Sequence, residues 1–123
     1  MPAAVLVVHQ ETNVRERILT ALRAAGHSAA GFDDPLMALD AIESDSRVRV
    51  LVTRVDFGEG RLNGIALARM LHHKRLGVKV VFVGRPEYVQ QLGESDPFFP
   101  HPVDTEALAV LVGYLLAEKT EPA

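Results

Sequence analysis

Cysteine and tryptophan are both absent from the 123-residue chain, and aromatic residues make up only 6% of it. Without cysteine there can be no disulfide, no thiolate nucleophile and no zinc site built on sulfur. No apolar run reaches the roughly 18 residues of a membrane span. The formal net charge of −3 argues against a basic surface for nucleic acid. The first four residues lack the basic segment of a secretory signal. We therefore expect a cytoplasmic protein that binds neither membrane nor nucleic acid directly.

The residues that are present favour one packed domain. Hydrophobic residues make up 48% of the chain and charged residues 24%, which is typical of a soluble globular protein. A chain of this length can bury a sufficient core without disulfides or metals. We expect a single domain over residues 1–119 and a flexible tail over residues 120–123.

Short β-branched runs alternate along the chain with segments of helical periodicity. The strands are expected at residues 4–8, 28–32, 48–55, 78–83 and 97–99. The helices are expected at residues 12–25, from 35 onward, between 63 and 77, at 86–92 and at 104–119. Asp34, Asn63 and Asp104 are expected to cap three of them, and Leu36, Leu39 and Ile42 to form the inner stripe of the second helix. This alternation predicts a parallel sheet covered by helices on both faces.

In such a sheet, a site lies beyond the carboxyl ends of the strands. Gly58, Gly60 and Gly64 resemble a phosphate-binding loop only loosely, because their spacing fits neither nucleotide fingerprint. We interpret them as turn residues. A loop that binds a flavin phosphate would need small and hydroxyl-bearing residues directly after the first strand. Only Thr12 supplies a hydroxyl there, so the sequence gives little support to a flavin site. No nucleophile–base pair or carboxylate dyad stands at the strand ends, so an enzyme is not expected.

Five segments in order resemble the receiver domain of two-component response regulators. They are residues 5–11, 38–39 with 50–53, 63–69, 80–83 and 101–104. The resemblance covers about residues 5–116. It implies a flavodoxin-like three-layer α/β/α sandwich with a five-stranded parallel sheet in the order 2-1-3-4-5.

The positions at which the chain departs from that family carry the functional prediction. The family's pair of magnesium-binding aspartates corresponds to His9 and Gln10, and only Glu11 is retained. The phosphoacceptor corresponds to Arg54, the switch hydroxyl to Gly84 and the lysine to His101. Magnesium prefers carboxylate oxygens, and a guanidinium cannot accept a phosphoryl group. We therefore expect weak or absent magnesium binding and no Mg-dependent aspartyl phosphorylation.

A rival register places the acceptor at Asp56, which lies eight residues before Gly64 and shares strand parity with Arg54. This register needs the strand to run two residues further. We favour Arg54.

The altered pocket leaves two further alternatives open. His9, Arg54 and His101 could converge on a small anion or a nucleotide, or the two histidines could hold a metal. We favour a simpler interpretation, in which Arg54 pairs with Glu11 or Asp56 and no ligand or metal is bound. His27, His72 and His73 are interpreted as turn and helix-end residues.

The last helix is apolar nearly all round. Leu108, Leu111, Val112 and Leu115 suffice for a core stripe, so Val110 and Tyr114 are expected to form an exposed patch. In the resembled family this region is a common dimer and output surface. The family's switch aromatic corresponds to Phe98, and the resemblance implies a cis bond before Pro102.

Together these features predict a stand-alone, atypical receiver-like domain of phosphorelay-type signal transduction. It would act as a regulatory protein-interaction module, would have protein partners in a signalling pathway, and would form a homodimer through the last helix.

Overall fold

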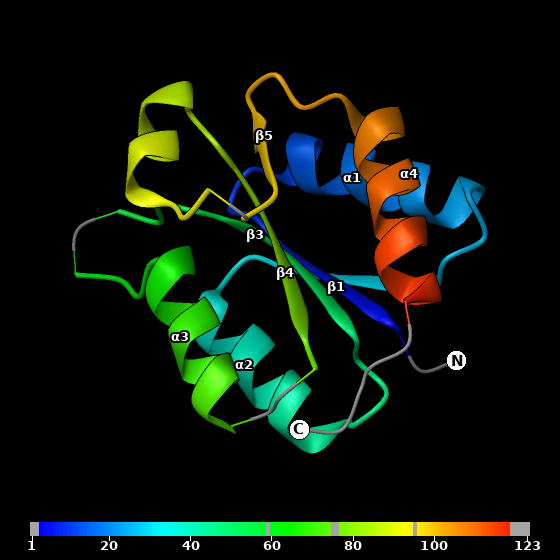
Figure 1. Cartoon of the computed structure of the whole chain (residues 1–123), viewed down its shortest axis with the longest axis horizontal. Helices are drawn as coiled ribbons and strands as arrows, with labels where there is room; N and C mark the ends of the chain where they lie inside the picture. Colours follow the sequence, from blue (N-terminus) through cyan, green and yellow to red (C-terminus); the bar gives the residue numbers. More distant parts are fainter. Residues whose placement is uncertain (1–2, 59, 75–76, 95, 119–123) are drawn as a thin grey trace.

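Five short strands form one parallel sheet in the computed structural model, which describes residues 3–58, 60–74, 77–94 and 96–118 (Figure 1). The sheet has the expected order β2-β1-β3-β4-β5. Its strands are β1 (Val5–Val8), β2 (Ala29–Phe32), β3 (Val50–Arg54), β4 (Lys79–Gly84) and β5 (Phe98–Pro100). The predicted flavodoxin-like, receiver-type sandwich is therefore confirmed.

The helices that follow the strands begin where the sequence predicts. They are α1 (Thr12–Ala24), α2 (Pro35–Ser44), α3 (Gly64–Lys74), the 3-10 helix η1 (Pro86–Gln91) and α4 (Thr105–Ala117). The side chains of Asp34, Asn63 and Asp104 accept hydrogen bonds from backbone N–H groups in the first turns of α2, α3 and α4. Each of these bonds satisfies a donor that the helix itself leaves unpaired. The expected helix end at Lys119 and the expected tail at 120–123 lie outside the described residues.

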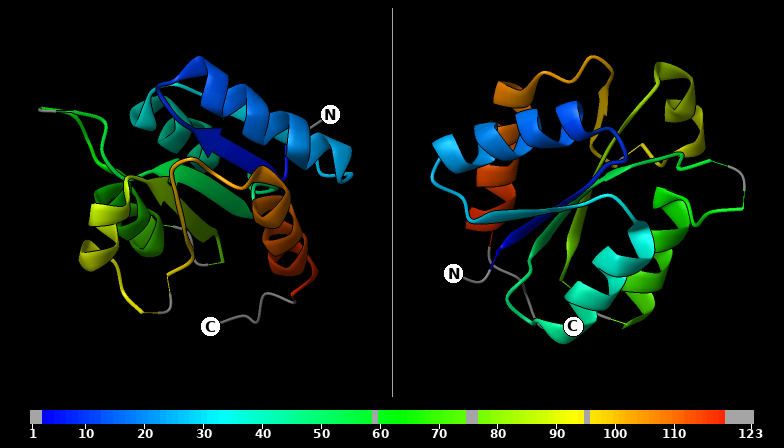
Figure 2. Two further views of the ribbon diagram at one scale, coloured as in Figure 1. Left: turned by 90° about the horizontal axis from the view of Figure 1, so that it is seen from above. Right: turned by 180° about the vertical axis from the view of Figure 1, so that it is seen from behind.

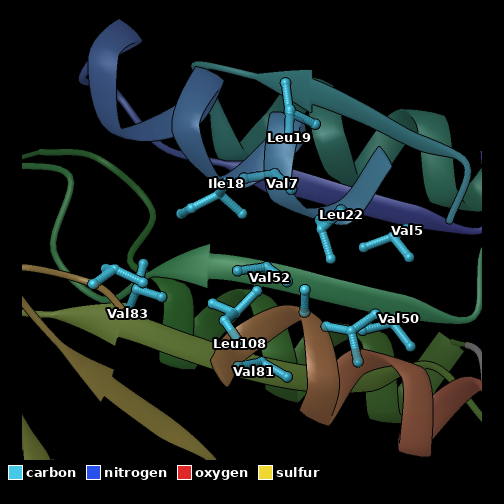
Figure 3. Close-up of a cluster of buried hydrophobic side chains, with 13 residues drawn as sticks. Val5, Val7, Ile18, Leu19, Leu22, Val50, Val52, Val81, Val83 and Leu108 are labelled. Carbon is cyan, nitrogen blue, oxygen red and sulfur yellow. The ribbon is translucent and has the colours of Figure 1, made fainter. Parts of the chain in front are cut away.

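The two faces of the sheet are covered by different helix pairs. Helices α1 and α4 pack on one face and α2 and α3 on the other (Figure 2). Figure 3 shows the first core, where Ile18 and Leu22 of α1 and Leu108 of α4 meet the valines of β1, β3 and β4. Burial on both faces explains why the central strands read as continuous apolar runs.

The prediction that Leu36 belongs to the inner stripe of α2 is wrong. Leu36 is 58% exposed, as is Met37, and the buried stripe of α2 consists of Pro35, Ala38, Leu39 and Ile42. At about 100° per residue, Leu36 lies about 110° from the centre of that stripe. Packing against the sheet selects the narrower stripe, and this leaves Leu36 facing outward.

The α2–α3 face is less completely covered toward β4. A small third core joins Val55, Ala68 and Phe82, and the partly buried Val80, Tyr88 and Phe98 pack against it. The segment over this part of the sheet is η1, coloured yellow-green beyond α3 in Figure 1. Because η1 has only six residues and none of them is fully buried, it shields less of β4 than an α-helix would.

No helix within the described residues is both long and apolar enough to cross a lipid bilayer.

Candidate functional site

Polar side chains gather at the carboxyl ends of β1, β3 and β5. His9 follows β1 directly, Arg54 ends β3, and His101 follows β5. Backbone hydrogen bonds join each of these ends to a neighbouring strand: the N–H of His9 donates to the carbonyl oxygen of Phe32, that of Val55 to Val83, and that of His101 to Gly84 at 2.8 Å. Residues far apart in the sequence therefore meet at the edge of the sheet where the sequence predicts the altered pocket.

His9 and His101 are in direct contact at this edge. Their Nε2 atoms are 3.2 Å apart and their ring centroids 5.2 Å apart. His9 is completely buried, whereas His101 is partly buried. A contact of this length between two ring nitrogens is a hydrogen bond only if one of them carries a proton and the other does not.

A backbone contact determines which nitrogen carries the proton. The N–H of Glu11 donates to Nδ1 of His9 at 3.1 Å, so that Nδ1 must be unprotonated. Neutral His9 then carries its proton on Nε2 and donates it to Nε2 of His101. His101 must accept there, and its own proton lies on Nδ1. The two rings therefore form a directed pair of neutral imidazoles.

The surroundings of the pair favour the neutral form. Burial makes the largest contribution to lowering the pKa of His9, and together with the positive charge of Arg54, the neighbouring His101 and Arg15 it brings that pKa to about 3. Burial and Arg54 also lower the pKa of His101, although Glu11 opposes this change. The pocket thus contains a cation that belongs to the protein and two imidazoles that remain uncharged at neutral pH.

Arg54 takes the position at the end of β3 that the sequence assigns to it. Its Nη1 lies 3.5 Å from Oε1 of Glu11, and its side chain is 20% exposed while that of Glu11 is 58% exposed. The expectation that Arg54 pairs with Glu11 or Asp56 is met through Glu11. The ion pair is long and partly exposed, so it offsets only part of the positive charge of the guanidinium and does not enclose it.

The residues at the magnesium-equivalent positions do not fit that ion. Glu11 supplies the single carboxylate, and it faces Arg54. Gln10 donates through Nε2 to the carbonyl oxygen of Phe57 at 2.7 Å, and this bond turns its amide N–H toward the loop after β3. Magnesium requires several oxygen ligands in octahedral geometry. An imidazole, an amide and one carboxylate engaged with arginine do not provide them.

The histidine pair is also unsuited to a metal. A histidine that binds a metal through Nε2 normally carries its proton on Nδ1. Nδ1 of His9 is already the acceptor of the Glu11 N–H bond, so metal binding would set two donors against each other. Among the described residues, no group of three or more histidines and acids is placed to hold a metal ion.

Asp56 lies beyond the end of β3 and is fully engaged. Its Oδ2 accepts the hydroxyl proton of Tyr88 at 2.6 Å, and its Oδ1 accepts the backbone N–H of Gly58 at 2.9 Å. These two bonds, with small contributions from Arg54 and Arg85, hold the pKa of Asp56 below its ordinary value. Asp56 therefore links the loop after β3 to η1. Nothing in the sequence indicates Tyr88, because it lies 32 residues away along the chain.

Gly64 has a role at the site that its interpretation as a turn residue does not include. A Cβ atom at this position would lie 2.2 Å from the carbonyl oxygen of Arg54. The N–H of Gly64 donates to the carbonyl oxygen of Val55 at 2.8 Å. The start of α3 thus rests on the end of β3, and only glycine allows that approach. Gly58 and Gly60 do adopt the positive φ angles of turn glycines.

The other residues singled out from the sequence lie around the pocket or away from it. Phe98 packs against the core that contains Phe82. The bond between His101 and Pro102 is cis, as expected. Val110 and Tyr114 are 60% and 69% exposed on the outer surface of α4. They belong to α4, whereas the histidines follow β1 and β5.

Solved structures of receiver domains have the same fold. The receiver domain of NtrX from Brucella abortus is 23% identical, with a TM-score of 0.80 over 94% of this chain and 99% of that one. A response regulator receiver domain protein from Clostridium thermocellum is 16% identical, with a TM-score of 0.79 over 93% and 94%. The receiver domain of the hybrid histidine kinase CckA is 24% identical, with a TM-score of 0.74 over 91% and 97%. At these identities the likeness establishes the fold.

No protein-family model and no curated protein matches this sequence.

Proposed function

We propose that the chain is an atypical receiver-like module of response-regulator signalling, which is not phosphorylated by the Mg-dependent route and acts through contacts with other proteins. The fold supports the first part of this proposal, and the chemistry of the pocket supports the second. No catalytic residue is assigned.

The observation that carries the proposal is the position of Arg54. A guanidinium at the carboxyl end of β3, 3.5 Å from Glu11, puts a fixed positive charge where the resembled family has its acceptor carboxylate. Arginine stays protonated at physiological pH and is no nucleophile toward a phosphoryl donor. Neutral His9, Gln10 and His101 supply neither the metal ligands nor the lysine of that family.

The direct test uses the chain with magnesium and acetyl phosphate, followed by intact-mass measurement at neutral pH. We expect no species that carries an added phosphoryl group, while a receiver domain with its acceptor aspartate, treated in parallel, gains one. Beryllofluoride with magnesium should also leave the amide spectrum of the chain unchanged. A phosphoryl group on any aspartate of the chain would overturn the proposal.

Phosphorylation at Asp56 remains the first alternative. Asp56 follows β3 and is exposed enough to meet a phosphoryl donor. Against this, Tyr88 and Gly58 already occupy one oxygen each, and the surrounding residues offer no other group of the family's acceptor site. If the mass experiment shows phosphorylation, Asp56→Asn should abolish it.

A small anion or nucleotide that binds Arg54 is the second alternative. The observation in its favour is that the Arg54–Glu11 contact is long, so an anion could compete with Glu11 for the guanidinium. His101 would contribute a hydrogen bond from Nδ1 rather than charge, and His9, whose ring nitrogens bond to Glu11 and His101, would hold that ring in place. The test is a thermal-shift series with phosphate, sulfate and ATP. A rise in Tm with ligand concentration, absent in Arg54→Gln, would favour this alternative.

Protein partners are proposed to bind on the helical surfaces, and Val110 and Tyr114 are proposed to form a homodimer contact. Two large apolar side chains, both more than half exposed on one helix, support this assignment. A cytoplasmic location is part of the same proposal, as the setting of response-regulator signalling.

A further inference from the structure

A groove lies between α3 and the segment that follows η1, on the part of the α2–α3 face that η1 does not cover. Its volume is about 560 Å³. Ile65 and Ala68 of α3, Val80 and Phe82 of β4, and Leu115 of α4 supply its apolar surface. Val80, Ile65 and Leu115 remain only partly buried. This volume is within the range of pockets that enclose a ligand or several side chains.

The architecture indicates what kind of element would fill the groove. Each face of a parallel sheet in this class is covered by helices, and the groove lies where that coverage is incomplete. Apolar residues of β4 alternate between the two faces, and Val80 and Phe82 point to the side on which α3 packs. An amphipathic helix that laid its apolar face on Val80 would complete the layer.

The charges around the groove select among possible occupants. Its α3 side carries Arg69 and His72, both exposed, and α3 contains no acidic residue among Gly64–Lys74. Within the described residues, no ion pair engages Arg69. The chain as a whole has a net charge of −3, so this cationic side contrasts with the rest of the molecule.

The other side of the groove has a different charge. Asp96 lines it and accepts the N–H of Gly93, and the ammonium group of Lys79 is already paired with Glu118. An occupant with acidic residues along one edge would therefore be oriented with that edge toward Arg69 and away from Asp96. Charge pairs of this kind contribute register and specificity more than affinity.

From these observations we infer that the groove is a docking site for an acidic amphipathic helix of a partner protein. Its apolar residues would contact Val80, Ile65 and Leu115, and its carboxylates would face Arg69. The inference is independent of phosphorylation and uses neither Val110 nor Tyr114, although Leu115 of the groove lies on the same helix. A second copy of the chain is a poorer occupant where the two-fold axis passes through the groove, since the Arg69 side chains of the two copies would then lie close together.

The probe is a synthetic helical peptide of about 14 residues, or about four turns, with leucine at i, i+3, i+4 and i+7 and glutamate on the opposite face. A matched peptide carries lysine in place of every glutamate. Each is titrated into the isotopically labelled full chain, and amide chemical shifts give both the binding surface and Kd. We expect the glutamate peptide to shift the amides of Ile65, Arg69, Val80 and Phe82, and to bind more tightly than the lysine peptide.

Two charge reversals provide the controls. Arg69→Glu lies on an exposed side of the groove and should fold normally, and we expect it to weaken binding of the glutamate peptide by about fivefold or more. The same variant should bind the lysine peptide more tightly than the unmodified chain does. Arg17→Glu makes the identical change in net charge on exposed α1, outside the groove, and should leave Kd unchanged.

Several results would overturn the inference. The first is equal binding of the glutamate peptide by the chain and by Arg69→Glu, and the second is a preference of the unmodified chain for the lysine peptide. The third is a set of shifts that map to α1 and to Val110 and Tyr114 instead of the groove, and the fourth is the absence of shifts at about 1 mM peptide. Concentration-dependent shifts of the groove amides without peptide would assign the site to a second copy, and would also count against it.

Discussion

The Nε2 atoms of His9 and His101 lie 3.2 Å apart, and the backbone N–H of Glu11 determines which of them donates. Protonation of either ring would place two N–H donors against each other. The folded protein therefore resists protonation of both rings, and this has a consequence for its stability in acid.

We predict that the free energy of unfolding decreases as the pH falls below about 6.5. Since the pKa of His9 is about 3 in the folded protein, the unfolded chain binds more protons between those two values. Stability from this group is thus complete above the unfolded pKa and declines as the pH decreases, by at most about 1.4 kcal/mol per pH unit for His9. Urea unfolding at a series of pH values measures it.

Two variants test whether the pH dependence of the unfolding free energy comes from the His9–His101 pair. His9→Gln should flatten it between pH 6.5 and 4, while His73→Gln, an exposed residue near the end of α3, should not alter it. A stability that increases on acidification through this range would contradict the neutral-pair interpretation.

Arg54→Asp should destabilise the protein and should not restore phosphorylation. The change puts a carboxylate beside Glu11 and near Asp56, where an ion pair stood before. We expect a loss of about 1–2 kcal/mol in the free energy of unfolding, measured by urea denaturation. Arg47→Asp makes the same change at an exposed pair with Asp45, and should have little effect. An Arg54→Asp protein that is more stable, or that accepts a phosphoryl group, would disprove this account of the pocket.

Gly64→Ala should be clearly destabilising, because the added methyl group would lie 2.2 Å from the carbonyl oxygen of Arg54. Relief requires α3 to move away from the end of β3, and we expect a loss of about 2 kcal/mol or more. Gly113→Ala is the matched control in α4, where the new methyl group would meet only the His27 side chain, at 3.4 Å. There the gain in helix propensity should offset the contact. Equal Tm values for the two variants would contradict the prediction.

Tyr88→Phe should raise the pKa of Asp56 toward its ordinary value, because the phenolic hydroxyl makes the largest contribution to lowering it. A titration of the Asp56 carboxyl carbon by NMR measures the change. The lowered pKa of this carboxylate also stabilises the folded protein. That contribution is present above the pKa of the unfolded state and disappears as the pH falls through the pKa of the folded state. Tyr114→Phe, which alters an exposed tyrosine on α4, should leave the Asp56 titration unchanged.

Introducing positive charge at Val110 and Tyr114 tests the proposed dimer contact. We expect Val110→Lys combined with Tyr114→Lys to raise the dimer dissociation constant about tenfold or more, as measured by sedimentation equilibrium. Leu36→Lys combined with Met37→Lys changes two residues of similar exposure on α2 and should leave it unchanged. A monomeric unmodified chain at about 0.1 mM would exclude this contact as a stable dimer.

The order of elements could be predicted because it depends on local signals. Continuous apolar runs, capping residues at Asp34, Asn63 and Asp104, and alternation with helical periodicity together imply a parallel sheet. Which face of α2 is buried could not be predicted, because both Leu36 and Ala38 suit a helix and only contact with the sheet distinguishes them.

Part of the candidate site could also be predicted from the sequence. Residues that follow strands in a parallel sheet must meet at one edge, which places His9, Arg54 and His101 near each other. The direction of the hydrogen bond between the rings depends on the Glu11 backbone, and the engagement of Asp56 depends on Tyr88. Both are tertiary contacts that leave no periodic signal in the sequence.

The outermost strands of the sheet limit how this protein can associate. At one margin β2 has four residues, and at the other β5 has three and ends in Pro100, whose nitrogen has no proton to donate. Neither strand offers enough free main chain for a neighbouring sheet to extend. Assemblies of this molecule should therefore be built from side chains on its helices, and substitutions there can redirect its partners without disturbing the sheet.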